Sequence, residues 1–167
     1  MAKQNAGKIF EFQIINSIPN YMYKLRLKDT SVRFKNDTNP CDMIVFYDGR
    51  FYMFELKSTK NSSLPFANIH YHQFKDLELA DKIEGLHAGF LIEMRKYNET
   101  YYLPIKKALD YVENSGRKSF SIDFLRENGI KIRQTLKRTR YTFDMEKLIT
   151  EDLGEWKFLY FSYKKYW

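Results

Sequence analysis

Apolar residues recur along this chain with two different periods, which separate helices from strands. Ile14, Ile15 and Ile18 follow the spacing of one helix face, so we expect a first helix over Ala6–Ser17. Residues 21–27 are rich in strand formers and predict a first strand. The chain is therefore expected to open with one helix and one strand.

The next segment predicts a hairpin of two short strands. Residues 43–47 and residues 50–54 are apolar and rich in strand formers. Asp48 and Gly49 stand between them, and this pair is a strong signal for a tight hairpin turn. A hairpin of this size can bring a residue before its first strand close to a residue at the end of its second strand.

Charged residues stand at both of these positions. Asp42 precedes the first strand, and Glu55 and Lys57 end the second, on one face because side chains alternate along a strand. Carboxylate oxygens suit Mg²⁺, which lowers the pKa of a bound water and stabilises charge on a phosphoryl oxygen. The lysine can orient the attacking water or stabilise the transition state. The pattern predicts a metal-dependent site for phosphate chemistry with these three residues as its catalytic groups.

The same spacing has a simpler interpretation, because a strand that ends in Glu-x-Lys is commonly a solvated edge. Here the charges follow residues 51–54, which we expect to be buried on both faces. Charges at the end of a buried strand need partners or a metal. This context favours the interpretation as a nuclease.

The remaining elements follow without a repeat or linker, so residues 1–167 predict a single domain. We expect a polar loop over residues 58–65 and a helix over residues 68–84 with Asn68 as its N-cap. Gln73 shares the inward face of that helix with apolar residues. The other predicted elements are a second hairpin over residues 89–94 and 100–103 and helices over residues 104–113 and 120–128.

The composition favours a polyanionic partner. The 28 Lys and Arg exceed the 21 Asp and Glu, giving a net charge of +7. The lone Cys41 excludes an intrachain disulfide and a zinc site with several cysteines, and it is compatible with a reducing cytoplasm. No apolar run approaches twenty residues and no secretory segment is recognisable, so we expect a cytoplasmic protein without a membrane span.

Two basic segments are candidates for DNA contact. We expect residues 26–40 to be a short polar projection between the first two strands, and this segment carries Lys28, Arg33 and Lys35. Residues 131–140 are rich in cations with aromatic residues close behind, which suits contact with phosphates and stacking on bases. A solvated charged face is the competing interpretation of the second segment.

The two ends of the chain leave further alternatives open. Glu11 lies at the edge of the apolar stripe of the first helix, so it either faces the acidic pocket as an additional metal ligand or flanks the stripe. Residues 156–167 are mostly aromatic, and we expect them to pack on the sheet or at a dimer contact.

Longer segments of the chain resemble the RecU family of Holliday-junction resolvases, over roughly residues 7–133. The matching positions are Gly7-Lys8-Ile9-Phe10-Glu11, Glu55-Leu56-Lys57-Ser58-Thr59-Lys60-Asn61, Leu64-Pro65-Phe66, Asn68, His70, His72-Gln73, Gly116-Arg117-Lys118-Ser119, Phe124, Glu127-Asn128-Gly129 and Ile132. A bare Asp…Glu-x-Lys pattern would indicate only the wider PD-(D/E)xK nuclease superfamily.

This resemblance implies an α/β fold with a restriction-endonuclease-like (PD-(D/E)xK) core, in which helices flank a central mixed β-sheet. It implies a Mg²⁺-dependent homodimeric endonuclease, with Mn²⁺ as a possible substitute, that cuts four-way junctions in recombination and repair. The metal ligands of the family correspond to Asp42, Glu55 and Gln73, and its transition-state lysine corresponds to Lys57. The Leu56 carbonyl is a supplementary ligand, and Lys60 is a further candidate for DNA contact.

Two other functions compete with junction resolution. One is a restriction-type or other branched-DNA endonuclease of the same superfamily, which would need elements that read the major groove. The other is a non-catalytic DNA-binding protein that retains the fold. The presence of Asp42, Glu55 and Lys57 argues against the second.

Overall fold

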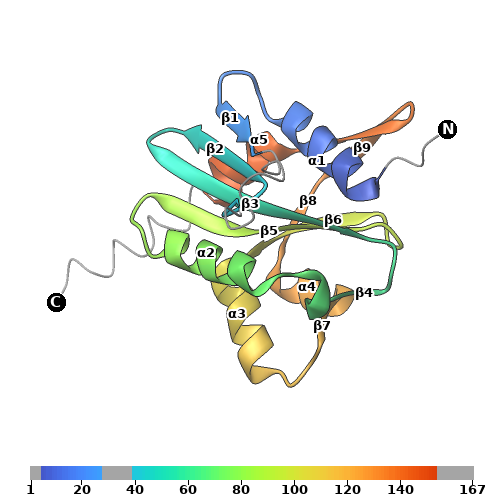
Figure 1. Cartoon of the computed structure of the whole chain (residues 1–167). Helices are drawn as coiled ribbons and strands as arrows, with labels where there is room; N and C mark the ends of the chain where they lie inside the picture. The colour runs from blue at the N-terminus through green and yellow to red at the C-terminus, as the bar shows by residue number, and fades with distance from the viewer. Residues whose placement is uncertain (1–4, 28–38, 154–167) are drawn as a thin grey trace, which may run out of the picture.

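A six-stranded mixed sheet lies at the centre of the computed structural model, which describes residues 5–27 and 39–153 (Figure 1). Its strand order is β1-β2-β3-β5-β6-β8. β3 and β5 pair in parallel, and every other neighbouring pair in this sheet is antiparallel. The central strands are β1 (Tyr23–Arg26), β2 (Met43–Tyr47), β3 (Arg50–Thr59), β5 (Leu86–Met94), β6 (Glu99–Pro104) and β8 (Ile130–Ile132).

Helices and two small ribbons surround this sheet. The helical segments are α1 (Ala6–Ser17), the 3₁₀ turn η1 (Phe66–Asn68), α2 (Tyr71–Asp81), α3 (Ile105–Asn114), α4 (Ile122–Asn128), α5 (Met145–Lys147) and the π-helical turn η2 (Leu148–Asp152). The ribbons pair β4 (Ser63–Pro65) with β7 (Ser119–Ser121) and β9 (Gln134–Lys137) with β10 (Arg140–Phe143). This arrangement confirms the predicted fold class of a mixed sheet flanked by helices.

The turn between β2 and β3 fixes the register of the hairpin that bears the acidic residues. Asp48 and Gly49 have φ angles of 49° and 72°. Two successive positive φ values define the type I′ turn, whose twist matches the strands that it joins. The hairpin therefore has the pairing that the sequence predicts, with Met43 opposite Phe54.

The two faces of the sheet carry separate halves of the core. Phe10 and Ile14 of α1 belong to the same buried cluster as Phe54 of β3 on one face. On the other face, Leu77 of α2 belongs to a second buried cluster with Phe90 of β5. Figure 1 shows α1 above the sheet and α2, α3 and α4 below it. Side chains that alternate along β3 therefore point to different helices.

The loop expected over residues 58–65 is wrong in part. β3 continues to Thr59, and each of its residues from Phe51 onward pairs with β5. Thr59 is buried and pairs with Met94. Polar side chains at this strand end suggested a loop, but the parallel neighbour supplies backbone partners as far as Thr59. Residues 63–65 then form the short strand β4.

Two predicted helix starts also differ from the structure. The helix expected over residues 68–84 begins at Tyr71 and ends at Asp81, because Asn68 belongs to the preceding 3₁₀ turn and His70 is the N-cap. The helix expected from residue 120 begins at Ile122, since Ser121 caps it by accepting the Phe124 N–H at 3.1 Å. The first helix and the second hairpin agree with the predictions.

Residues 131–140 form β8, β9 and the turn into β10. Part of their charge is used inside the molecule, since Lys131 Nζ lies 3.4 Å from Glu99 Oε2. Residues 28–38, which contain most of the predicted projection, and residues 154–167 lie outside the described residues. Across the described parts of the chain, no helix has both the length and the apolar character of a membrane span.

Candidate active site

The β2–β3 pairing ends with Met43 opposite Phe54, and Asp42 follows one position beyond it, close enough to Glu55 for the two carboxyl groups to interact. The Asp42 N–H donates to the Phe54 carbonyl at 3.1 Å, which ties Asp42 to β3 beyond the end of β2. Asp42 Oδ2 accepts the Leu56 N–H at 2.7 Å, so its carboxylate is held against β3. The hairpin thus brings the two predicted carboxylates together on one face of the sheet.

Lys57 and Gln73 complete a hydrogen-bonded cluster with Glu55. Lys57 Nζ lies 3.0 Å from Glu55 Oε1 and donates to Gln73 Oε1 at 2.9 Å. Gln73 Nε2 donates in turn to Glu55 Oε1. Gln73 stands in the first turn of α2, and this helix packs against β3, so a helix residue can reach the strand. All four predicted residues of the pocket therefore meet in the structure.

Gln73 is anchored by a contact that the sequence did not reveal. The main-chain N–H of His70, at the N-cap of α2, donates to Gln73 Oε1 at 2.9 Å. A side chain three residues into a helix commonly reaches back in this way. A Gln three residues after the N-cap is the sequence signal for this contact. Because the predicted N-cap was Asn68 and not His70, Gln73 was not recognised from the sequence as that residue.

Burial and a neighbouring charge strongly perturb Glu55. Glu55 is only 2% exposed to solvent. Burial, and then the charge of Asp42, raise the pKa of Glu55 from 4.5 to about 7, although Lys57 opposes this shift. Two close carboxylates of which one resists ionisation form a site that a cation would stabilise.

The donor types in this pocket fit a hard divalent cation. Asp42 and Glu55 offer carboxylate oxygens and Gln73 offers an amide oxygen, and all of these are ligands that Mg²⁺ accepts. Within residues 5–27 and 39–153, no cluster of three His, Cys, Asp or Glu side chains is present. A metal held here would therefore depend on the amide, a main-chain carbonyl and water besides the two carboxylates.

Glu11 forms an ion pair with Arg26. Its Oε2 accepts from Arg26 Nε at 2.8 Å and lies 2.5 Å from the second guanidinium nitrogen, so α1 is tied to β1. Arg26 pairs with Met43, the residue after Asp42. Glu11 thus lies at the same end of the sheet as the carboxylate pair, engaged in an ion pair, and its role as a metal ligand stays a prediction.

The predicted DNA contacts are only partly described. Lys60 is exposed and follows the last residue of β3, close in sequence to Lys57. Lys28, Arg33 and Lys35 lie outside the described residues. A thiol mechanism finds no support, because Cys41 is buried and its burial raises the pKa of the thiol to about 12.

A second buried carboxyl lies on the opposite face of the same strand ends. Glu93 of β5 accepts from the Ser58 hydroxyl at 2.5 Å, and burial raises the pKa of Glu93 above its usual value. Ser58 and Glu93 are register partners in the parallel pair. Nothing in the sequence signals this contact, because the residues are 35 positions apart and come together only through the parallel pairing of β3 with β5.

The fold and the pocket define a mixed α/β protein whose sheet carries two opposed carboxylates and a lysine at one end. The chain belongs to the RecU family, since the family model described as Recombination protein U matches residues 5–144. This finding confirms the resemblance identified in the sequence.

Three proteins illustrate the range of similarity. The SPbeta prophage-derived uncharacterized protein YotM of Bacillus subtilis strain 168 is 30% identical over 172 residues, which cover 90% of this chain and 88% of that protein. The Holliday junction resolvase RecU of Streptococcus equi subsp. zooepidemicus is 30% identical over 116 residues, covering 68% of this chain. The aligned part spans only 56% of that resolvase. The solved structure of Hjc, a Holliday junction resolvase from Archaeoglobus fulgidus, is 14% identical, with a TM-score of 0.47 over 66% of this chain and 82% of that one.

Proposed function

We propose that this protein is a Mg²⁺-dependent endodeoxyribonuclease that resolves four-way DNA junctions by paired cuts in recombination and repair, and that it acts in the cytoplasm. The observation that carries the proposal is the closeness of the Asp42 and Glu55 carboxylates, with Lys57 bonded to Glu55. Membership of the RecU family, and similarity to proteins named Holliday junction resolvases, support the choice of substrate.

The reaction is the hydrolysis of a phosphodiester. An oxygen of water forms a bond to phosphorus, and the bond from phosphorus to one sugar oxygen breaks, with the departing oxygen taking up a proton. Asp42, Glu55 and Gln73, helped by the Leu56 carbonyl, would hold Mg²⁺ or Mn²⁺. When bound, the cation supplies Lewis acidity for the attacking water and for the phosphoryl oxygens.

Lys57 is the residue that neutralises charge on the phosphate. Its ammonium now contacts Glu55 and Gln73, within the pocket that would receive the scissile phosphate. Gln73 Oε1 already accepts hydrogen bonds from Lys57 and from the His70 N–H, which engages both of its lone pairs. Gln73 can therefore ligate through Oε1 only when one bond is released. Lys57 is the partner whose release sends a cation toward the phosphate.

Paired cutting requires two active sites, and we assign the second to another copy of this chain. Four large apolar side chains, which we call the apolar face, lie together on the side of the sheet that bears Glu55. They are Tyr23, Leu25, Phe46 and Phe51, with exposed fractions of 60%, 41%, 37% and 47%. Tyr23 is opposite Phe46, and Phe46 is opposite Phe51, so the side chains form a row across three strands. Such a row favours a protein contact.

Cleavage of synthetic substrates tests the proposal. A four-way junction and a linear duplex with the same arm sequences would be incubated with Mg²⁺, with Mn²⁺ and with EDTA. We expect symmetric cuts in opposing strands of the junction, with either metal and not with EDTA. Equal cutting of linear duplex at defined sequences would indicate a restriction-type enzyme. Junction binding without cutting under any metal would indicate a non-catalytic protein.

A further inference from the structure

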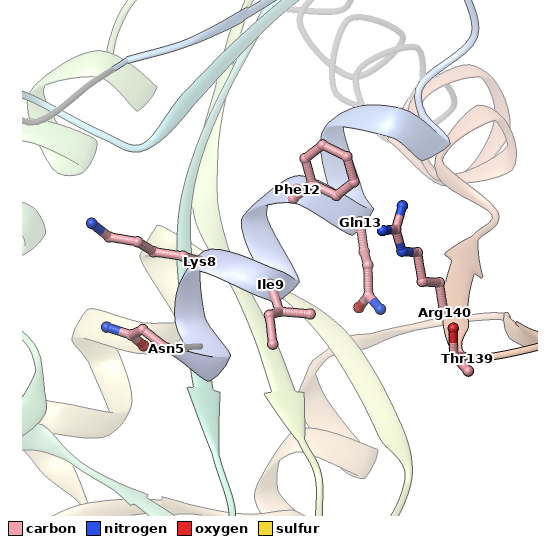
Figure 2. Close-up of a pocket in the computed structure, with 7 residues that line it drawn as sticks. All are labelled: Asn5, Lys8, Ile9, Phe12, Gln13, Thr139 and Arg140. Carbon is pink, nitrogen blue, oxygen red and sulfur yellow. The ribbon is translucent and has the colours of Figure 1, made fainter. Parts of the chain in front are cut away.

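A groove separates the first half of α1 from the tip of the β9–β10 hairpin (Figure 2). At its closed end, the Phe143 ring packs edge-on against Phe10 at 5.6 Å, and the Phe143 N–H donates to Ser17 Oγ at 3.0 Å. Toward the hairpin tip the two elements separate and leave a cavity of about 660 Å³. Its lining residues are Asn5, Lys8, Ile9, Phe12, Gln13, Thr139 and Arg140.

The cavity combines cations with an open aromatic ring. The Arg140 guanidinium lies over the Phe12 ring at 5.4 Å, and Phe12 is nevertheless 50% exposed. Neither Lys8 nor Arg140 forms an ion pair with any residue in the described parts of the chain. Figure 2 shows the Arg140 guanidinium beside the Phe12 ring and the Lys8 side chain extending from α1 away from the hairpin. Two unneutralised cations on either side of one exposed ring match the phosphates and the base of a nucleotide.

A buried amide adds a group that can recognise a base edge. Gln13 is 8% exposed, and Figure 2 shows its amide turned between α1 and the hairpin residues Thr139 and Arg140. A carboxamide offers a donor and an acceptor side by side, which is the pattern that pairs with a base. The cavity volume falls within the range of about 300–1,000 Å³ that is usual for small-ligand sites. One base with its sugar therefore fits.

The groove opens at the same end of the sheet as the candidate active site. Glu11 is one helical turn after Lys8 and directly before Phe12, and its ion pair with Arg26 places this part of α1 beside the residues that precede β2. Figure 1 shows the start of α1 and the β9–β10 hairpin reaching toward the side where β3 leads into β4. A strand that leaves the pocket of Asp42 and Glu55 can pass over the strand ends into the groove.

The geometry points to a binding site for single-stranded DNA in the groove between α1 and the β9–β10 hairpin. One base stacks on Phe12, its edge meets Gln13, and the flanking phosphates contact Lys8 and Arg140. Arg138, exposed at the hairpin turn with a φ of 58°, extends the cationic track. Duplex DNA is the poorer ligand, because its bases are already stacked. This site rests on the proposed action on DNA, and it would hold a single strand beside the position of the cut.

Fluorescence anisotropy in EDTA measures binding without cleavage. The full chain would be titrated against a labelled single strand and against a blunt duplex. Phe12→Leu keeps an apolar residue but removes the ring, and we expect it to weaken single-strand binding by roughly 5- to 100-fold, the usual range for loss of one stacked base. Duplex binding should not change.

A double variant tests the phosphate contacts. Lys8→Gln with Arg140→Gln should weaken single-strand binding and reduce the slope of log K against log salt by about 1.4, because two phosphate contacts are lost. The matched control is Arg117→Gln with Lys118→Gln, which removes the same charge from exposed positions on the loop between α3 and β7. Thermal melting verifies that each variant is folded.

The outcomes separate this inference from the proposed function. Normal single-strand binding by Phe12→Leu, or an equal loss in the Arg117/Lys118 control, would overturn the groove as a site. A protein that cuts no junction but loses single-strand binding on Phe12→Leu would retain the groove and lose the nuclease assignment. Crosslinking of a strand carrying 5-iododeoxyuridine should label Phe12 or its neighbours, and labelling confined to other elements would contradict the site.

Discussion

At the scale of single residues, the proposed cleavage of DNA should depend most clearly on Asp42. Its carboxylate is fixed by the Leu56 N–H and faces Glu55, so it is the predicted ligand with the best-defined orientation. Asp42→Asn should abolish junction cleavage, while junction affinity stays equal or rises because repulsion of phosphate falls. Asp48→Asn makes the same change in charge at the other end of the hairpin and should cut normally. Cleavage by Asp42→Asn at the parental rate would refute the assignment.

Lys57 should affect the rate of cutting far more than the affinity. In the proposed mechanism its ammonium neutralises charge that develops on the phosphate, and loss of one such contact typically lowers the rate by about 10²–10³. Single-turnover cleavage by Lys57→Ala should therefore fall by that factor with little change in junction affinity. Lys75→Ala removes an exposed lysine of α2 as the control. A large loss of affinity with normal single-turnover cleavage would make Lys57 a binding residue.

The raised pKa of Glu55 makes the metal-free protein less stable as pH rises. The folded carboxyl titrates near 7 and the unfolded one near 4.5, so the folded state binds more protons between these values. The free energy of unfolding should fall by about 3 kcal/mol over this window. Glu55→Gln cannot lose a proton, so its stability relative to the parent should increase from pH 4.5 to pH 7 and then level off. Urea titrations in EDTA would measure this difference.

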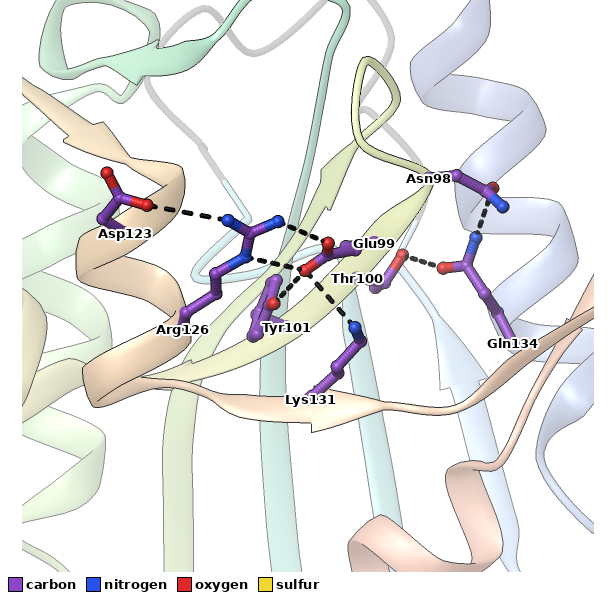
Figure 3. A network of polar contacts seen from close by, with 8 residues as sticks. All are labelled: Asn98, Glu99, Thr100, Tyr101, Asp123, Arg126, Lys131 and Gln134. Carbon is purple, nitrogen blue, oxygen red and sulfur yellow. Dashed lines mark hydrogen bonds and ion pairs between the residues drawn. The ribbon is translucent and has the colours of Figure 1, made fainter.

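The pKa of Glu99 is shifted in the opposite direction from that of Glu55, so Glu99 serves as a comparison. Figure 3 shows its carboxylate among Arg126, Tyr101 and Lys131, and the hydrogen bond from Arg126 is the main reason that its pKa falls to about 2. The ionised carboxylate stabilises the fold above pH 4.5, and this contribution is lost as pH falls through 2. Glu99→Gln should thus destabilise the protein at pH 7, with no gain between pH 4.5 and 7. If the free energy of unfolding changed with pH in the same way for Glu55→Gln and the parent, the raised pKa of Glu55 would be contradicted.

At the scale of elements, the pairing of β5 with β6 depends on the absence of a side chain at Gly89. A Cβ there would lie 2.5 Å from the Leu103 carbonyl oxygen and 2.7 Å from the Tyr102 ring. The Leu103 carbonyl belongs to the paired strand and cannot move away from an added methyl group. We therefore expect Gly89→Ala to lower the free energy of unfolding by about 1–3 kcal/mol or more. Gly116 has a φ of +65° with open space around it, and Gly116→Ala should cost only about 1 kcal/mol. Equal effects in urea denaturation would disprove this packing argument.

The sequence predicted the elements whose signals are local. The Asp48-Gly49 turn and alternation along β3 were enough to place Asp42, Glu55 and Lys57 together, because a hairpin is closed by neighbouring residues. The parallel contact between β3 and β5 escaped prediction, since nothing near Thr59 signals a partner at Met94.

Contacts between distant elements escaped prediction for the same physical reason. Glu11 and Arg26 are 15 residues apart, and the helix pattern alone could not tell whether Glu11 faced the pocket or a cation. The groove joins α1 to a hairpin more than 120 residues later, so the basic residues near position 140 gave no indication of Phe12 as their neighbour. Periodicity defines the face of an element, while the partner of that face depends on topology.

At the scale of the whole molecule, the apolar face should determine whether two active sites act together. Phe51 and Glu55 are on the same side of β3, four residues and about 13 Å apart along the strand. A two-fold contact through Phe51 would therefore hold both pockets close to the axis, at a fixed separation that a four-way junction can match. A linear duplex does not present two scissile phosphates in that arrangement.

Replacing Phe46 and Phe51 with Ser should prevent the proposed dimer from forming, because it removes two rings, with centroids 4.7 Å apart, from the centre of the apolar face. The variant keeps the carboxylate pair, so it should still nick junctions but lose the paired cut. Sedimentation velocity and the ratio of nicked to resolved product measure the two effects. Leu136→Ser removes an exposed apolar residue from β9, outside the apolar face, and should behave like the parent protein in both measurements. Paired cutting by a monomeric parent protein would refute the two-fold arrangement, and a dimeric double variant would place the contact elsewhere.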